Sequence, residues 1–299
     1  MDVFVLQMGK VGSSAITGAM LAQGLNAVQM HWLGRDQLLA SLQHDLLDLS
    51  KDDDVALRGL DGFAQNIANA RRLMWYQRYH RRQGQRLRIV SLVRDPLDWY
   101  WGHLAENFDY YSAAMLGWYR AVFDAAVQAE QIEMVTETFH RALFHCFGRV
   151  RRRVDHPRFN VAAGKQKANG IHHDFLCQQL MKLRLPTAWF DVFFKPPLGI
   201  DVYRTPLDTE SGLARYETEY CKVLLLRYEN LQQALPHLSH FVGLDELQLN
   251  KVNRSEDKPV PFSLAALRRR VLPDEAMLQK LYATRYCRHF GYRPSGPSI

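Results

Sequence analysis

The sequence predicts an α/β fold in which a mostly parallel central sheet is flanked by helices. An apolar run at residues 3–6 leads through a glycine-containing turn into an amphipathic helix at residues 14–23. The β-branched stretch 88–93 stands directly before a helix-start signal. The continuous apolar run inside residues 220–229 is typical of a strand that is buried on both faces, as in a parallel sheet. Alternation of strands with helices favours this class.

The other elements follow from their periodicity. Residues 26–33 alternate between apolar and polar side chains, which predicts a second strand with His31 near its end. Residues 199–203 indicate a turn followed by a short strand. The remaining patterns predict mostly helical segments at residues 35–47, 55–83, 96–108, 112–147, 175–194, 230–241, 263–270 and 274–289.

Length and charge set the broad limits. A chain of 299 residues forms one large domain or two small ones, and its net charge of +7 suits acidic partners such as nucleotides, acidic glycans, nucleic acid or a membrane surface. No nucleic-acid-binding module is recognisable, so we expect no nucleic-acid partner. We expect neither a transmembrane segment nor a signal peptide, and therefore a cytoplasmic protein. The four widely spaced cysteines predict reduced thiols rather than a zinc site or disulfides.

The first turn has the composition of an anion site. It reads Gly9-Lys10-Val11-Gly12-Ser13-Ser14. Backbone N–H groups at a helix N-terminus, a lysine ammonium and two hydroxyls all favour phosphate-type oxygens. The loop is not a Walker A motif, because its lysine precedes the second glycine. The alternative is a plain tight turn with a lysine on the surface.

A second cation follows the strand at residues 88–93. Asp95 is a good N-cap and Pro96 suits the first helical position, so Arg94 stands between a strand end and a helix start. Ligands of open α/β sheets bind at this edge. The alternative is an ion pair between Arg94 and a nearby acid on the surface.

Residues 148–173 have few large apolar side chains and many cationic ones, including Arg149, the triplet 151–153 and Lys165. They predict an exposed basic loop or insertion, which either binds the acceptor or is merely solvated. The adjacent histidines His172 and His173 are a weak metal site without carboxylate or cysteine ligands nearby.

Taken together, these motifs resemble those of the sulfotransferases that use 3′-phosphoadenosine 5′-phosphosulfate (PAPS), in the carbohydrate or capsular-polysaccharide branch. The resemblance extends over most of the chain outside residues 148–173. It rests on the loop 9–14 and on the stretches 93–96, 199–203, 225–231 and 286–290. It implies a P-loop-type three-layer sandwich, a single domain over residues 1–299, and PAPS as co-substrate with no metal required. One position departs from the pattern, because Gly102 stands where the family usually has a serine that contacts the 3′-phosphate.

The resemblance also implies roles for residues of the donor site. Lys10 contacts the bridging oxygen and the 5′-phosphate, and Arg94 binds the 3′-phosphate. The loop from Gly9 to Ser14 holds the phosphosulfate, with the backbone of Val11 and Gly12 and the hydroxyls of Ser13 and Ser14 as donors. Cations of a late polar loop, Lys251 and Arg254 among them, close over the nucleotide.

The acceptor hydroxyl needs a base. His31 is the first choice, because it ends a strand beside the loop and its ordinary pKa suits neutral pH. His103 and Glu106, three residues apart on one helix, are the reserves. Four aromatic residues either stack on adenine or a sugar, or belong to the core: Trp32, Trp99, Tyr100 and Trp101.

Three functions are compatible with the sequence. The first is transfer of a sulfuryl group from PAPS to a hydroxyl, expected on a glycan. The second is a P-loop kinase or NTPase, which the register of the loop disfavours. The third is a non-catalytic binder of acidic polymers, which Gly102 and the basic segment would suit.

Overall fold

The computed structural model describes residues 2–31, 65, 67–76, 78–79, 82–150, 170–249 and 260–294. The chain divides into two compact units. The first comprises Met1–Arg94 and Trp189–Val252, and the second comprises Asp95–Ala188 and Asn253–Ile299. The chain therefore passes between the units three times.

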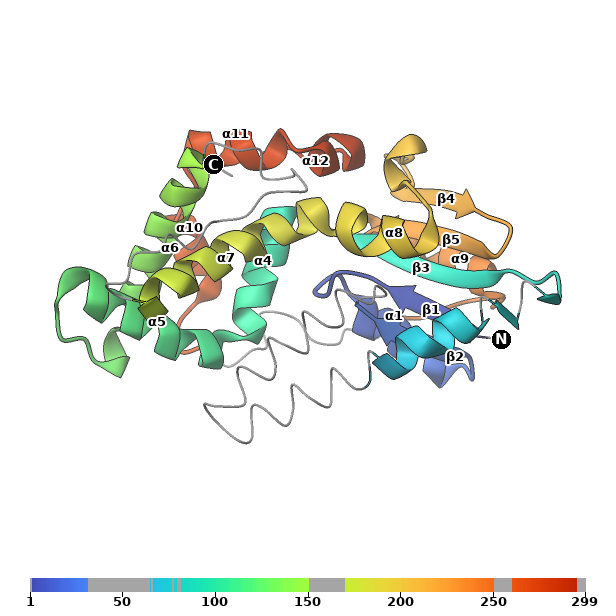
Figure 1. The fold of residues 1–299 in the computed structure, drawn as a ribbon, viewed down its shortest axis with the longest axis horizontal. Coiled ribbons are helices and arrows are strands. Elements are labelled where there is room, and N and C mark those ends of the chain that lie inside the picture. The colour runs from blue at the N-terminus through green and yellow to red at the C-terminus, as the bar shows by residue number, and fades with distance from the viewer. Residues whose placement is uncertain are drawn as a thin grey trace. The chain divides into compact units, whose positions relative to one another are not determined.

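The first unit contains a five-stranded sheet in the order β2-β1-β3-β5-β4 (Figure 1). The strands are β1 (Asp2–Leu6), β2 (Asn26–Met30), β3 (Leu87–Val93), β4 (Leu213–Glu217) and β5 (Cys221–Arg227). All neighbours are parallel except β4 and β5, which are antiparallel. The predicted α/β class with a mostly parallel sheet is confirmed.

The central strands are buried on both faces. Residues 3–6 of β1 and 224–226 of β5 are fully buried, as their unbroken apolar runs predict. Leu6 is paired with Met30, and Val93 is paired with Arg227. Parallel strands in this register end at one edge of the sheet, so the loops that follow β1, β3 and β5 start from that edge.

Helices cover the sheet of the first unit. They are α1 (Ser13–Ala22), α8 (Lys195–Leu198) and α9 (Leu231–Val242), and residues 67–76 and 78–79 are also helical. The helical residues 67–76 lie against β1, where the ring of Tyr76 meets Phe4 edge-on at 5.9 Å and Arg72 pairs with Asp2 at 3.5 Å.

The second unit is helical in its described residues. Its helices are α4 (Pro96–Glu106), α5 (Phe108–Phe123), α6 (Ile132–Arg149), α7 (Gly170–Trp189, whose last residue belongs to the first unit), α10 (Leu264–Arg270), α11 (Glu275–Tyr282) and α12 (Arg285–Phe290). Helix α6 packs against α5 and α11. The predicted N-cap at Asp95 is confirmed, because its carboxylate accepts hydrogen bonds from the N–H groups of Leu97 and Asp98.

Two expectations about the elements were wrong, and one element was missed. Residues 199–203 contain no strand: Gly199 ends α8 in the left-handed region, and Asp201 caps a short 3-10 helix (η3, Val202–Arg204). The antiparallel strand β4 was not predicted. The final helix over 274–289 is two helices, because Thr284 caps α12 through its hydroxyl.

The helices on either side extend into the basic loop predicted over residues 148–173. Helix α6 continues through Arg149, and α7 starts at Gly170, so residues 148–149 and 170–173 are helical rather than loop. The interior of that segment lies outside the described residues.

Candidate functional site

The carboxyl edge of the sheet has a topological switch point between β1 and β3. From β1 the chain moves to β2 on one side, and from β3 it continues towards β5 on the other side. In α/β sheets in general, ligands bind at the edge from which connections leave in opposite directions. The loop after β1 and the segment after β3, which begins with Arg94, both start from this point.

The loop after β1 has an unusual backbone. Gly9, Lys10 and Gly12 have φ angles of 82°, 53° and 79°, all in the left-handed region. Lys10 and Asp124 are the non-glycine residues with positive φ in the described part of the chain. An L-residue in this conformation is strained, and such strain is concentrated at binding and catalytic sites. The conformation at Lys10 therefore favours the anion loop over the plain turn.

Helix α1 begins at this loop. Gly12 is its N-cap, no side chain caps it, and its first turn contains no acidic residue. Ser13 is buried and Ser14 is exposed. Val11 is fully buried. The N-terminal N–H groups of α1 thus start directly beside the two loop glycines, as an anion site requires.

Arg94 lies against the same loop. Its Nη1 donates a hydrogen bond of 2.8 Å to the carbonyl oxygen of Lys10, and its guanidinium lies 4.5 Å from the centroid of the Tyr228 ring. Arg94 and Lys10 are 84 residues apart in the sequence. The structure therefore brings the guanidinium of Arg94 against the backbone of the loop that contains Lys10.

His31 is held at the end of β2 by Gln7. Its Nδ1 lies 3.1 Å from the backbone oxygen of Gln7 and 3.1 Å from the Nε2 of the same residue. The fully buried Gln7 side chain also accepts the N–H of Gly9. Nδ1 either donates its proton to the Gln7 carbonyl or accepts the N–H of the Gln7 amide, and a role as base through Nε2 requires the first arrangement.

Burial lowers the pKa of His31, and the ammonium of Lys10 lowers it further, while the hydrogen bond to the Gln7 carbonyl raises it in part. The imidazole is consequently neutral near pH 7, the state in which it can accept a proton.

Gly102, the position predicted to lie near the 3′-phosphate, and His103 and Glu106, the other two candidates for the catalytic base, belong to the second unit. Gly102 is buried within α4. His103 stacks on Trp99 at 5.1 Å, its Nε2 lies 2.8 Å from the hydroxyl of Tyr111, and its Nδ1 lies 3.4 Å from Asn107. Both ring nitrogens of His103 thus face hydrogen-bonding neighbours within α4 and α5. Glu106 is exposed.

Three of the aromatic candidates belong to the core of the second unit: Trp99, Tyr100 and Trp101 are at most 2% exposed. Of the two alternatives for these residues, stacking on a ligand or membership of the core, their burial supports the core. Trp32, Lys251 and Arg254 lie outside the described residues.

The structure adds two residues that the sequence analysis did not single out. Gln7 is an ordinary polar position at the end of β1, and only the loop geometry shows that it contacts both Gly9 and His31. Tyr228 follows β5, and its contact with Arg94 depends on the pairing of β3 with β5. Tyr228 lies inside the predicted strand region 220–229 and inside the stretch 225–231 that carries the resemblance, but neither pattern assigns it a role.

Comparison with known families gives one match. Residues 160–292 match the NKWYS family, described as "Putative capsular polysaccharide synthesis protein". The chain is thus similar, over less than half of its length, to a polysaccharide-related family. The match includes β4, β5 and Tyr228, and it excludes the loop after β1. No curated protein and no solved structure matches the chain.

Within the described residues, no three His, Cys, Asp or Glu side chains cluster in a way that could hold a metal ion. No helix among the same residues is long and apolar enough to cross a membrane.

Proposed function

We propose that this protein is a sulfotransferase that moves a sulfuryl group from PAPS to an acceptor hydroxyl on a carbohydrate. The proposal includes a P-loop-type three-layer sandwich as the fold and residues 9–14 with Arg94 as the donor site. The match to a polysaccharide-related family supports a glycan as the acceptor.

The contact between Arg94 and the carbonyl of Lys10 is the observation that carries the proposal. The guanidinium of Arg94, at the end of β3, contacts the backbone of Lys10 in the loop after β1, which supports a shared site at the edge where α/β sheets bind ligands. A donor with phosphate groups at both ends of its ribose needs two cations. A kinase would need a magnesium-binding acid near the loop, whereas Asp95 is occupied as a helix cap.

Each residue of the proposed site has a separate role in the transfer of the sulfuryl group. Lys10 offsets the charge that develops on the leaving phosphate, and the N–H groups at the start of α1 hold the phosphosulfate oxygens. Arg94 binds the 3′-phosphate, where its planar fork suits a phosphate group. His31 accepts the proton of the acceptor hydroxyl through Nε2.

Transfer of labelled sulfate from PAPS to capsular-type polysaccharides tests the proposal. Removing the ammonium in Lys10→Ala should lower the transfer rate by about 10²- to 10³-fold, because one charge-stabilising donor is lost. Lys222→Ala is the matched control, since Lys222 is an exposed lysine on β5 of the same sheet. Equal activity of the two variants would contradict the role of Lys10.

Calorimetry with adenosine 3′,5′-bisphosphate, the product nucleotide, separates this function from the alternatives. If the protein binds the bisphosphate but transfers sulfate to no glycan, the proposed donor site stands and the proposed class of acceptor is refuted. Absence of binding, together with retention of acidic polysaccharides, would favour the non-catalytic binder. Magnesium-dependent hydrolysis of ATP would favour the NTPase.

A further inference from the structure

A tyrosine ring lies where three strand ends of the sheet meet. Tyr228 follows β5 directly, Arg94 follows β3, and the loop with Gly12 follows β1. These are neighbouring strands of one sheet, in the order β1-β3-β5. Tyr228 thus belongs to the same edge as the donor loop although about 130 residues separate it from Arg94 in the sequence.

Tyr228 contacts both other members of this cluster. The guanidinium carbon of Arg94 lies 4.5 Å from the ring centroid, a distance at which a cation is attracted by the face of an aromatic ring. A Cβ atom added at Gly12 would come within 2.9 Å of the ring carbon Cε2. The ring therefore fills the space beside Gly12 that a side chain would otherwise occupy.

Arg94 is held from two directions. The carbonyl of Lys10 accepts from its Nη1 at 2.8 Å, and the Tyr228 ring lies against the guanidinium. A long flexible side chain loses conformational freedom when it binds a ligand, and a side chain that is already oriented loses less. An aromatic ring can orient the guanidinium without removing the donors that a phosphate needs.

We propose that Tyr228 is a positioning residue for the donor's 3′-phosphate, which acts by orienting Arg94. The inference rests on the proposed function and adds to it a residue and a specificity: the ring favours nucleotides with a 3′-phosphate over those without one. The ring face, and not the hydroxyl, carries this role.

The test compares Tyr228→Leu with Tyr228→Phe. We expect Tyr228→Leu to weaken binding of adenosine 3′,5′-bisphosphate about tenfold, as loss of a cation–π contact predicts. Binding of 5′-AMP, which lacks the 3′-phosphate, should change much less. Tyr228→Phe keeps the ring and should bind both nucleotides like the wild type. Equal weakening for both nucleotides would overturn the inference, because the ring would then support the loop and not Arg94.

A double-mutant cycle keeps the inference testable if a variant is destabilised. In an Arg94→Ala background, Tyr228→Leu should cause no further loss of affinity for the bisphosphate, because its partner is already absent. Additive losses would overturn the inference. Thermal unfolding of each variant checks that it is folded. If the wild-type protein itself binds no bisphosphate, the proposed function fails first, and the two failures are thereby distinguished.

Discussion

At the scale of single residues, the loop after β1 depends on glycine at position 12. Its φ angle of 79° is unfavourable for any other residue, and a Cβ there would meet the Tyr228 ring at 2.9 Å. Gly18, in contrast, is exposed in α1, and a Cβ there would meet nothing within 4 Å. Substitutions at Gly12, the N-cap of α1, and at Gly18, inside α1, therefore test whether the loop backbone requires glycine.

We expect Gly12→Ala to lower the free energy of unfolding by about 1–2 kcal/mol through backbone strain, and to weaken binding of the bisphosphate as well. Gly18→Ala should raise the free energy of unfolding by about 0.5–1 kcal/mol, because alanine is the better helix former. Denaturant unfolding and calorimetry measure both effects. Equal behaviour of the two variants would contradict the role of the loop backbone.

The lowered pKa of His31 predicts how the transfer rate depends on pH. Because burial lowers its pKa from the usual 6.5, the acidic limb of the transfer rate should have its midpoint below pH 6.5: the imidazole is neutral and active above that midpoint, and protonated and inactive below it. His31→Ala should remove most of the activity while nucleotide binding persists. His240→Ala, an exposed histidine on α9, is the control. If His31→Ala keeps the acidic limb of the transfer rate unchanged, that limb belongs to the titration of another group and not to His31.

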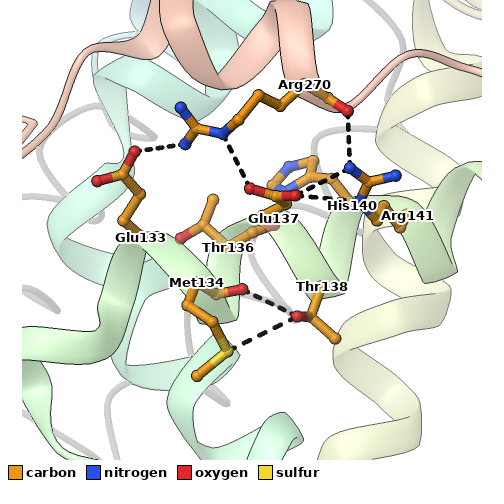
Figure 2. Close-up of polar contacts among 8 residues, drawn as sticks. All are labelled: Glu133, Met134, Thr136, Glu137, Thr138, His140, Arg141 and Arg270. Carbon is orange, nitrogen blue, oxygen red and sulfur yellow. Dashed lines mark hydrogen bonds and ion pairs between the residues drawn. The ribbon is translucent and has the colours of Figure 1, made fainter.

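At the scale of elements, an ion network attaches α10 to α6. Arg270 Nε lies 3.0 Å from Glu137, its Nη2 also pairs with Glu133, and Arg141 donates both to Glu137 and to the carbonyl of Arg270 (Figure 2). The pKa of Glu137 is lowered by its hydrogen bonds to Arg141 and Arg270. These side chains are substantially exposed, so solvent and salt weaken the network.

Arg270→Ala should therefore lower the melting temperature only slightly, and the difference from the wild type should shrink at high salt. Arg269→Ala, on the same helix and also exposed, is the control. A salt-independent loss of stability would mean that Arg270 acts through packing of its apolar stem and not through charge.

The elements that sequence patterns predicted well are those with local signals. Asp95 and Pro96 mark a helix start, and the apolar run of β5 marks a buried strand, whatever lies elsewhere in the chain. Strand β4 alternates between buried and exposed residues from Ala214 to Glu217, so its signal was present but short. The 3-10 helix at Val202–Arg204 was taken for a strand because its start depends on a side-chain cap by Asp201, which apolar alternation does not reveal.

The site residues, like the elements, divide into those with a local sequence signal and those without one. The residues 9–14 are contiguous, and their glycine and lysine content predicts an anion loop directly. A rule about strand ends predicted that Arg94 lies at the same edge as this loop, but it did not predict the contact with the Lys10 carbonyl. Tyr228 and Gln7 could not be found in this way, because strand pairing and a buried amide bring them to the site.

At the scale of the whole molecule, the stability contributions of a fully buried histidine and a partly buried carboxyl respond to pH in opposite directions. His140 is fully buried and its pKa is lowered to about 4, by burial first and against a hydrogen bond to the Thr136 carbonyl. The unfolded chain therefore binds more protons between pH 6.5 and 4, and this group makes the fold less stable as the pH falls through that range. Burial raises the pKa of Asp95 to about 6, so this carboxyl makes the fold more stable as the pH falls from 6 towards 3.8.

The two effects oppose each other in the wild type, and single substitutions should separate them. In Asp95→Asn, which keeps a good N-cap, acidification from pH 7 to 4 should cost on the order of 2 kcal/mol more stability than in the wild type. In His140→Gln the same change of pH should cost less stability than in the wild type. Denaturant unfolding at several pH values measures both slopes, and parallel slopes in all three proteins would contradict the assignment.

The route of the chain between the two units limits how the protein can be divided. The matched region 160–292 starts in the second unit, passes through the first and returns to the second. It carries β5 without β3, the parallel neighbour along which all seven residues of β5 are paired. Expressed as a fragment, this region would leave that strand with an open edge and invite aggregation. Dissection by truncation is therefore unsuited to this protein, and domain-swap chimeras would have to exchange at least two separate stretches of sequence at once.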